Sequence, residues 1–447
     1  MTAFPHADAT FVSYDGGCVA AGQLARPDRY AYWDGDHDGL RIPRGAGLSY
    51  AAASFGAGAL SVEHVAFDRL LALDTGQRLV EVESGVRLGD LYRFLRRHNL
   101  YLPVQPGHPD ITIGGCIAAD VHGKNQSDHG TFSSQVMGLT LFHPRHGVLR
   151  ATREENPDVF ELTCGGYGLT GNVLTATLKV TPLPSGALDV RCTPVDDVED
   201  LPAALREAAT RSDFSYSWHD FSSRGRAFGA GFIEESSWRP EPAHTRTSDA
   251  AVRRTRITAR GRATWRYPIF NRYTTPALNA LYRTMRMHGA RTTHAPLYEC
   301  LFPAASKGYY FKMFGRSGFH EYQALVPERV FAPYVREVRE AIATCDVPVT
   351  LASGKLFAGE QRLLRFTGAG ICLALNFPRS PSSPLLMERL DALVIEAGGI
   401  PNIIKDSRLP AEVVERSYPE YENFRSALRT YDPQRWYRSE LSERLRL

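Results

Sequence analysis

The sequence predicts an α+β protein of two domains, and three observations support this fold class. The chain has 447 residues, whereas one hydrophobic core rarely grows beyond roughly 250–300 residues. In the first third, short apolar runs are separated by Gly, Pro and Asp, which is typical of short strands and helices joined by tight turns. Residues 319–405 follow a β-α-β-β-α-β order, which indicates a sheet with helices on one face.

The elements of the first half begin with a half-buried strand at 78–86, because apolar and polar residues alternate there. A helix follows at 87–99, where leucines and a tyrosine recur at helical spacing. Residues 172–184 alternate again and predict a long strand. The Pro- and Gly-rich run at 182–186 then predicts a domain boundary.

The elements of the second half alternate between strand and helix patterns. The helix at 328–343 places apolar side chains on one face, and the helix at 384–399 ends at two glycines. Around these helices we expect strands at 319–326, 347–357 and 363–377, and a short strand at 401–408.

The composition is that of an ordinary soluble chain, with 43% hydrophobic and 23% charged residues. The net charge of +3 is too small to indicate a nucleic-acid partner. No apolar run approaches the ~18 residues that a membrane span needs, and the first residues lack the pattern of a secretory signal. The seven cysteines contain no Cys-x-x-Cys pair, which predicts reduced thiols in a cytoplasmic protein.

Basic residues are distributed unevenly. Residues 238–291 contain twelve arginines and no lysine, with Glu241 and Asp249 as the acids. Such a run favours a solvated surface segment. The alternative that stays open is a basic face for phosphate groups or anionic lipid headgroups, and with it peripheral contact with a membrane surface.

Three Gly-rich segments, at 43–50, 106–125 and 165–171, are the strongest functional signal. The third contains a G-x-G-x-x-G pattern, but it leads into a strand rather than a helix, which excludes a Rossmann site. Glycines let a backbone approach an anion closely, and successive N–H groups form nests for phosphate oxygens. One such loop is usually a turn, whereas three predict one long anionic cofactor that lies across all of them.

These segments, in this order and at this spacing, resemble the flavin domain of the vanillyl-alcohol-oxidase-type FAD oxidoreductases. The decaprenylphosphoryl-β-D-ribose 2′-oxidase branch is the more similar one, because residues 104–125 resemble its second loop almost residue for residue. The likeness covers nearly the whole chain and is thin at 235–320. Further similar motifs are GGYGLTG at 165–171, the Trp218-His-Asp220 run, GKLF at 354–357, KDSR at 405–408 and YDP at 431–433.

The resemblance implies a two-subdomain, PCMH-type FAD-binding domain at 1–185 and a substrate domain at 186–401, whose antiparallel sheet is covered by helices. A C-terminal segment at 402–447 would return to the FAD domain. Many relatives tether FAD through a histidine at the position of Leu48, so noncovalent FAD is expected here. The residues implied to bind the cofactor are Arg44, Gly45, Gly47, Leu48, Ser49, Tyr50, Pro106, Gly107, Thr112, Gly114, Gly115, Ala118, His122, Gly123, Gly168, Gly171 and Val173.

The resemblance also implies a reaction. A secondary hydroxyl of a ribofuranose-type sugar would be oxidised to a ketone by hydride transfer to flavin N5, as the first half of an epimerisation that a separate NAD(P)H reductase completes. The substrate would be a polyprenyl-phosphoryl ribose, or a related glycosyl phosphate or nucleoside. The implied catalytic residues are Lys405, His122, Glu321 and Gln323, and the implied substrate contacts are Lys124, Lys355, Trp218, Cys372 and Asn376.

Several of these assignments leave alternatives open. Trp218 is equally well explained as a core residue, and His122 as a structural histidine beside a glycine turn. Counted back from Phe377-Pro378, the family's active-site cysteine falls on Ala374 and its polar neighbour on Cys372, so the identity of the substrate is open. Glu321 stands where relatives carry an amide, and its carboxylate can either serve as a base or bind a different pattern of hydroxyl groups.

Two other functions remain as alternatives. An alditol or aldonolactone oxidase uses the same fold, although those enzymes usually keep the tethering histidine that Leu48 replaces. A flavin-free binding protein is the alternative from another class. His143-Pro-Arg-His146 lacks a third converging ligand, so the sequence predicts no metal site.

Overall fold

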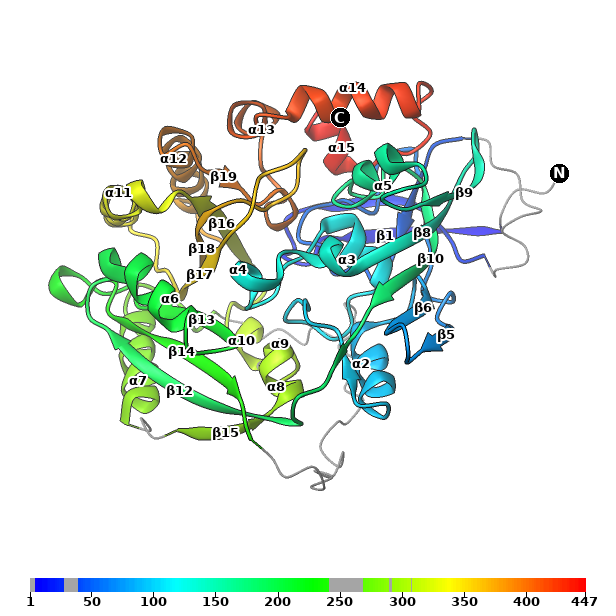
Figure 1. Ribbon diagram of the computed structural model, residues 1–447. Helices are drawn as coiled ribbons and strands as arrows, with labels where there is room; N and C mark the ends of the chain where they lie inside the picture. Colours follow the sequence, from blue (N-terminus) through cyan, green and yellow to red (C-terminus); the bar gives the residue numbers. More distant parts are fainter. Residues whose placement is uncertain (1–4, 28–38, 241–267, 289–291, 307) are drawn as a thin grey trace.

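The computed structural model describes residues 5–27, 39–240, 268–288, 292–306 and 308–447. Helices are mixed with largely antiparallel sheets, which confirms the α+β class (Figure 1). Most of the arginine-rich stretch at 238–291, namely 241–267 and 289–291, lies outside the described residues. None of the described helices combines the length and the apolar character that crossing a bilayer requires.

In the described residues of the N-terminal part, the strands form three sheets. The largest has the order β5-β6-β10-β8-β9 with antiparallel neighbours, and it comprises β5 (Leu70–Asp74), β6 (Leu79–Glu83), β8 (Val136–His143), β9 (Gly147–Ala151) and β10 (Asn172–Lys179). A sheet of order β1-β2-β4-β3 comprises β1 (His6–Val12), β2 (Val19–Ala25), β3 (Arg41–Arg44) and β4 (Leu60–Glu63). The third pairs β7 (Leu100–Tyr101) with β11 (Thr181–Pro182).

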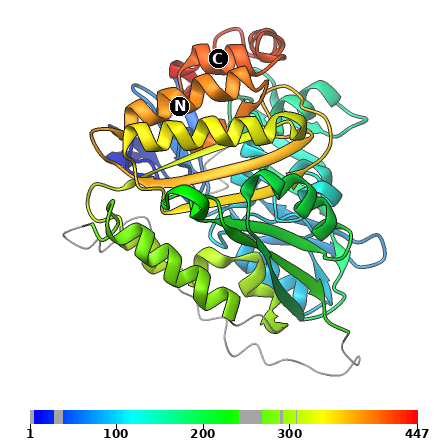
Figure 2. The same cartoon turned by 90° about the vertical axis from the view of Figure 1, so that its left-hand side faces the viewer.

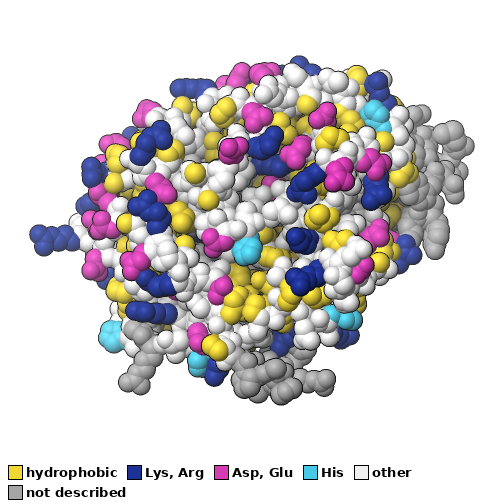
Figure 3. Space-filling model, in the orientation of Figure 1, with side chains coloured by type: hydrophobic (Ala, Val, Ile, Leu, Met, Phe, Trp, Pro, Cys, Tyr) yellow, Lys and Arg dark blue, Asp and Glu magenta, His cyan; other side chains and the backbone are white. Residues whose placement is uncertain are grey.

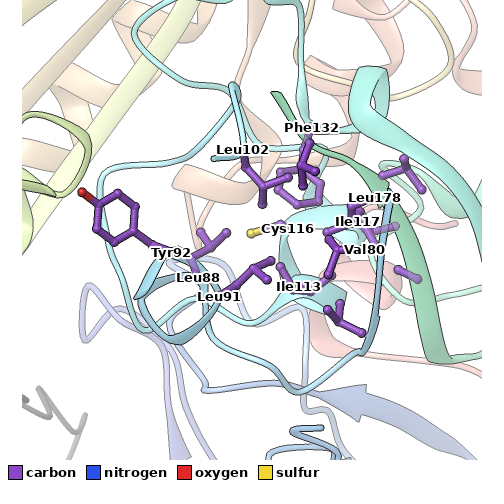
Figure 4. Packing of buried hydrophobic residues seen from close by; sticks show 14 of the residues in the cluster. Val80, Leu88, Leu91, Tyr92, Leu102, Ile113, Cys116, Ile117, Phe132 and Leu178 are labelled. Atoms are coloured by element: carbon purple, nitrogen blue, oxygen red, sulfur yellow. The ribbon is translucent and has the colours of Figure 1, made fainter. Parts of the chain in front are cut away.

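The core of this part forms between the five-stranded sheet and two helices. Figure 4 shows Leu88 and Leu91 of the first helix and Ile113 and Ile117 of the second gathered with Val80 and Leu178 of the sheet. All six side chains are fully buried, which explains why the apolar residues recur at helical spacing. The helices here are α2 (Leu88–Arg96), α3 (Ile113–Ala119), α4 (Gln126–His129), the 3₁₀ helix η1 (Phe132–Gln135) and α5 (Pro157–Thr163).

An eight-stranded sheet of order β15-β12-β14-β13-β17-β18-β16-β19 forms the second half, and all its neighbouring strands are antiparallel. Its part β17-β18-β16-β19 contains the β-α-β-β-α-β order expected at 319–405, which is thereby confirmed. The strands are β12 (Ala187–Val195), β13 (Phe214–His219), β14 (Gly231–Trp238), β15 (Thr293–Pro296), β16 (Phe319–Val326), β17 (Leu351–Phe357), β18 (Gly370–Pro378) and β19 (Ile400–Pro401).

Two long helices, α11 (Phe331–Cys345) and α12 (Ser383–Glu396), lie side by side on one face of this sheet (Figure 2). Tyr322, Leu373 and Leu375 point from the strands into the core beneath them. The opposite face is therefore free to present polar side chains. The remaining elements are η2 (Val198–Asp200), α6 (Leu201–Ala209), η3 (Gly225–Ala227), α7 (Thr274–His288), α8 (Leu297–Leu301), α9 (Pro303–Ser306), α10 (Gly308–Lys312) and η6 (Glu328–Val330).

The C-terminal helices return to the N-terminal part, as Figure 1 shows for the red helices beside α5. The backbone N–H of Arg41 donates to Trp436 O at 2.9 Å, and Asn172 donates to the Tyr437 hydroxyl at 2.5 Å. These contacts join the end of the chain to β3 and β10. The elements are α13 (Ala411–Ser417), α14 (Tyr421–Tyr431) and α15 (Glu440–Arg444).

Several expected strands are longer than the observed ones; β6 covers only Leu79–Glu83 and β17 only Leu351–Phe357, and three others differ more. At 401–408 only Pro401 is in a strand, and η7 (Ile403–Lys405) is a 3₁₀ turn, because the Asn402 side chain accepts a hydrogen bond from the N–H of Ile404. The strand expected at 363–377 begins only at residue 370. The strand expected at 172–184 ends at Lys179, and the chain then pairs with β7 instead.

Candidate active site

A cavity of about 690 Å³ lies between the glycine loops of the N-terminal part and the polar face of the eight-stranded sheet. Segments far apart in sequence meet there, from Tyr14 to Lys405. Every residue that the sequence predicted to bind cofactor or substrate lines this cavity. On the outer face shown in Figure 3, basic and acidic side chains are interspersed, in keeping with the small net charge.

The glycine loops meet because two glycines leave no room for a side chain. A Cβ on Gly168, at φ +82°, would lie 2.9 Å from Pro43 Cγ, so the third loop sits directly against the first. A Cβ on Gly45 would overlap Thr112 Oγ1, so the first loop sits against the second. The three loops therefore line one continuous wall, as expected for a ligand that crosses all of them.

Thr112 organises the second loop. Its hydroxyl oxygen accepts a hydrogen bond from the N–H of Gly115 at 3.3 Å and so caps the N-terminus of α3. Gly114 packs against Ser84 on the other side, where a Cβ would lie 3.1 Å from the serine Cβ. The first turn of α3 thus lines the cavity with backbone rather than side chains.

The opposite wall is a strand face, and its composition follows from strand alternation. In the antiparallel register Glu321 lies opposite Asn376, and Lys355 lies opposite Cys372. Gln323 lies two residues beyond Glu321 on the same face. All five side chains line the cavity, while the residues between them pack beneath α11 and α12.

Lys405 and Glu321 form an ion pair at the edge of this wall. Lys405 Nζ lies 3.0 Å from Glu321 Oε1 and 4.1 Å from the centroid of the Tyr50 ring. The ammonium is therefore held between a carboxylate of the sheet and an aromatic face of the first glycine loop. The pair joins two predicted catalytic residues to one predicted cofactor residue.

Lys355 differs from this pair, because its Nζ makes no ion pair or hydrogen bond within the described part of the chain. Burial, and then the positive charges of Lys405 and Lys124, lower the pKa of Lys355 to about 8. Burial raises the pKa of the neighbouring Cys372 thiol to about 12, so the cysteine is neutral. Gln323 donates a hydrogen bond to Cys372 Sγ at 3.2 Å.

Lys124 and Trp218 lie on the β13–β14 side of the cavity. Lys124 Nζ is 3.7 Å from Glu234 Oε1 and 4.3 Å from the Tyr216 ring centroid. Trp218 stacks on Phe232 with centroids 5.6 Å apart and is only 5% exposed. Trp218 is therefore packed among aromatic side chains and also lines the cavity. Its position is compatible with both a core residue and a substrate contact.

His122 lies at the end of the second loop. Its Nδ1 donates to the carbonyl of Gly123 at 3.1 Å, and its ring meets the edge of Phe357 at 4.8 Å. Burial and the charge of Lys355 hold the pKa of His122 well below its usual value. The imidazole is therefore neutral, with Nε2 as the acceptor nitrogen.

Sequence reasoning missed several residues of the cavity. Asn402 donates to Gln323 Oε1 at 2.5 Å and, through the cap on Ile404, shapes the turn that presents Lys405. Tyr310 is hydrogen-bonded to Thr350 at 2.7 Å between the oxygens. The position of Asn402, three residues before the predicted lysine, was the available signal; Tyr310 lies where the family likeness is thin.

No group of His, Cys, Asp and Glu suited to a metal ion occurs among the described residues. His143 instead lies 3.5 Å from Asp432 Oδ2, and His146 bonds the carbonyl of Tyr431 at 2.8 Å. These two histidines join β8 to the C-terminal helices.

Comparisons with known proteins agree with this geometry. Residues 36–152, which contain the first two glycine loops, match the family model of an FAD-binding domain. The chain is 28% identical to a decaprenylphosphoryl-β-D-ribose oxidase of Mycolicibacterium smegmatis, over 91% of this chain and 89% of that one. It is 28% identical to an uncharacterized protein of Streptomyces coelicolor, over 78% and 96%. A mouse L-gulonolactone oxidase is 35% identical over 26% of each chain.

The residues of the cavity fit FAD. The close contacts at Gly45 and Gly168 leave no room for a Cβ. The loops therefore present their backbone to the cavity, and backbone N–H groups are suited to bind a diphosphate. The volume of about 690 Å³ is within the range of roughly 300–1,000 Å³ typical of cofactor sites. Together with the matches, these features support an FAD-dependent oxidoreductase that is similar to the decaprenylphosphoryl-β-D-ribose oxidases.

Proposed function

We propose that this FAD-dependent enzyme oxidises a secondary hydroxyl of a ribofuranose-type sugar to a ketone, as the first half of an epimerisation. The substrate is a polyprenyl-phosphoryl ribose or a related glycosyl phosphate or nucleoside, and a separate NAD(P)H reductase completes the reaction. One observation carries the proposal: Lys124, Lys355 and Lys405 converge with a polar strand face in the cavity that the glycine loops also line. The long match to a ribose oxidase supports the choice of sugar.

The two walls of the cavity are proposed to bind the cofactor and the substrate, respectively. Residues 1–185 and 402–447 hold the cofactor, and residues 186–401 supply the substrate wall. The matched FAD-binding segment at 36–152 supports the first assignment, and the location of Glu321, Lys355 and Cys372 on β16–β18 supports the second. A cytoplasmic location and a surface contact with a membrane stay predictions.

When bound, FAD supplies the acceptor for a hydride from the substrate carbon. The protein contributes charge and position. We propose that Lys405 orients the reacting hydroxyl and stabilises negative charge on its oxygen, and the ion pair of Lys405 with Glu321 supports this role. Gln323 and Asn376 offer amides to further sugar hydroxyls, and the ammonium of Lys124 suits a phosphate on the substrate.

FAD is proposed to be noncovalent, because the hydrocarbon side chain of Leu48, which lines the cavity, has no atom that can form a bond to the flavin. Precipitating the protein with acid tests this. All flavin absorbance should appear in the supernatant, and yellow colour retained in the washed pellet would contradict the proposal.

The reaction is tested by anaerobic bleaching of the flavin with a panel of ribosyl phosphates, nucleosides, alditols and aldonolactones. We expect bleaching by ribofuranose derivatives, and Lys405→Ala should slow it at least 100-fold. Lys179→Ala, an exposed lysine at the end of β10, is the matched control and should bleach at the wild-type rate. Unchanged bleaching in Lys405→Ala would remove this residue from the mechanism.

The same panel separates the alternatives. The partial match to an L-gulonolactone oxidase favours an alditol or aldonolactone oxidase as the second candidate, and bleaching by those compounds alone would replace the ribose proposal. Purified protein that shows no flavin absorbance and binds no added FAD would instead indicate a flavin-free binding protein.

A further inference from the structure

Three lysines occur among the described residues that line the cavity, and their surroundings divide them into two classes. Lys405 has the carboxylate of Glu321 at 3.0 Å, and Lys124 has that of Glu234 at 3.7 Å. Each also lies over an aromatic ring, at 4.1 Å and 4.3 Å from the centroid. A carboxylate and an aromatic face both stabilise the ammonium form. These two lysines are therefore suited to remain cations.

Among the residues that the structure describes, Lys355 has neither a carboxylate nor an aromatic ring as a partner. It projects from β17 into the cavity wall opposite Cys372, whose neutral thiol supplies no charge. Within the described residues no carboxylate or hydrogen-bond acceptor lies within bonding distance of its Nζ. An amine that is desolvated and surrounded by like charges loses its proton more readily than one in water.

We propose that Lys355 is the base that takes the hydroxyl proton of the substrate, while Lys405 remains the cation that positions that hydroxyl. This assignment rests on the proposed oxidation. In the step, the O–H bond breaks, its proton goes to the lone pair of Lys355 Nζ, and its electron pair becomes the second bond of the ketone. The C–H bond of the same carbon also breaks, and its hydrogen leaves with both bonding electrons as a hydride. FAD would be the oxidant that accepts this hydride.

The other titratable groups around Lys355 are less suited to this task. His122 is neutral, but its pKa is held well below the usual value, so it binds a proton weakly. Glu321 is engaged by Lys405. The pKa of Lys355, lowered to about 8, lies near working pH, which is where a general base is most effective.

The charges that face Lys355 make the inference testable without turnover. Lys405 and Lys124 lower its pKa, and the carboxylate of Glu321 raises it. We label lysine with ¹³C at Cε and follow the FAD-loaded protein by NMR from pH 6 to 11, identifying the Lys355 signal by its loss in Lys355→Arg. Its midpoint should lie near 8, against the ordinary value of about 10.4 for a lysine side chain in water.

Two neighbouring variants should move this midpoint in opposite directions. Lys405→Met should raise it and Glu321→Gln should lower it, each by about one pH unit. A Lys355 ammonium that was exposed to water or paired with a carboxylate would respond much less. A midpoint near 10 in the wild-type protein would overturn the inference, whatever the substrate.

Anaerobic flavin reduction provides the second readout. The wild-type rate should rise with pH and level off above the NMR midpoint. Lys355→Arg keeps the charge but cannot accept the proton, so the rate should fall at least 100-fold with less than a tenfold change in substrate affinity. Small primary amines should restore part of the rate in Lys355→Ala. A Lys355→Arg rate within tenfold of wild type would refute the assignment.

These readouts distinguish the inference from the function on which it rests. If no sugar of the panel bleaches the flavin in the wild-type protein, the proposed function is wrong. The NMR midpoints would still decide whether Lys355 is the lysine that is neutral near working pH.

Discussion

Replacing Gly45 with alanine should weaken FAD binding, because this glycine is where the first two cofactor loops touch. The new Cβ would overlap Thr112 Oγ1 and lie 3.4 Å from both Thr112 Cβ and Cγ2. The threonine cannot simply turn away, since its hydroxyl caps α3 through Gly115. The methyl group must therefore push the loops apart or break the cap.

The expected magnitude follows from these two costs. Overpacking of this kind destabilises by about 1–3 kcal/mol, and loss of an N-cap by about 1 kcal/mol. If the loops hold FAD, about 1–3 kcal/mol of this appears as a Kd for FAD raised roughly 5- to 150-fold. The measurement is a titration of the apo-protein with FAD, followed by flavin fluorescence. The Tm of the apo-protein, measured in parallel, separates weaker binding from general unfolding.

A double-mutant cycle with Thr112→Ala supplies the control. That variant removes the oxygen in the way, so Gly45→Ala in its background should cost less affinity than it does alone, by at least 0.5 kcal/mol. If the losses of FAD affinity in the two single variants simply add in the double variant, the contact between residue 45 and Thr112 does not cause the loss in Gly45→Ala. A Gly45→Ala protein with the wild-type Kd would refute the reasoning altogether.

Two further outcomes are expected. Asn402→Ala removes the bond to Gln323 and the cap of the turn that carries Lys405, so the rate of flavin reduction should fall about tenfold or more with FAD content unchanged; an unaltered rate would show that this turn needs no cap. Burial raises the pKa of Glu235, but hydrogen bonds from Arg211 and Thr193 lower it by more, to a net value below the ordinary one. A carboxyl group whose pKa is lower in the folded state stabilises the fold at pH values above its unfolded-state pKa of about 4.3. This stabilisation is lost as the pH falls through the folded-state pKa. Glu235→Gln should therefore lower the Tm at pH 7 and lose this deficit toward pH 3, whereas an equal deficit at both pH values would contradict the assignment.

The long elements of the fold could be predicted because their patterns are local. The helix expected at 328–343 is α11, and its buried face includes Tyr334, Val335 and Val338, as its spacing indicated. The strand at 319–326 has the bounds of β16. In contrast, residues 401–408 have the apolar content of a strand but turn instead, because one side chain, that of Asn402, satisfies a backbone N–H locally.

The site divides in the same way. The glycine loops and the lysines could be identified individually from the sequence, since glycine in a loop and a lysine in a conspicuous motif are properties of a short segment. The sequence could not show which of these lysines is paired with a carboxylate. Glu321 and Lys405 are 84 positions apart and meet only because β16 lies beside η7.

The amino-acid order alone thus determined the α+β class, the three backbone loops suited to a diphosphate and the set of residues that carry charge or amide groups. Tertiary structure alone decided how these groups act on one another. Electrostatic energy and desolvation depend on distance and on exposure to water, and neither quantity is a property of a single segment. For this reason only the folded chain reveals that two cavity lysines are matched by carboxylates, while no carboxylate of the described residues lies within bonding distance of Lys355.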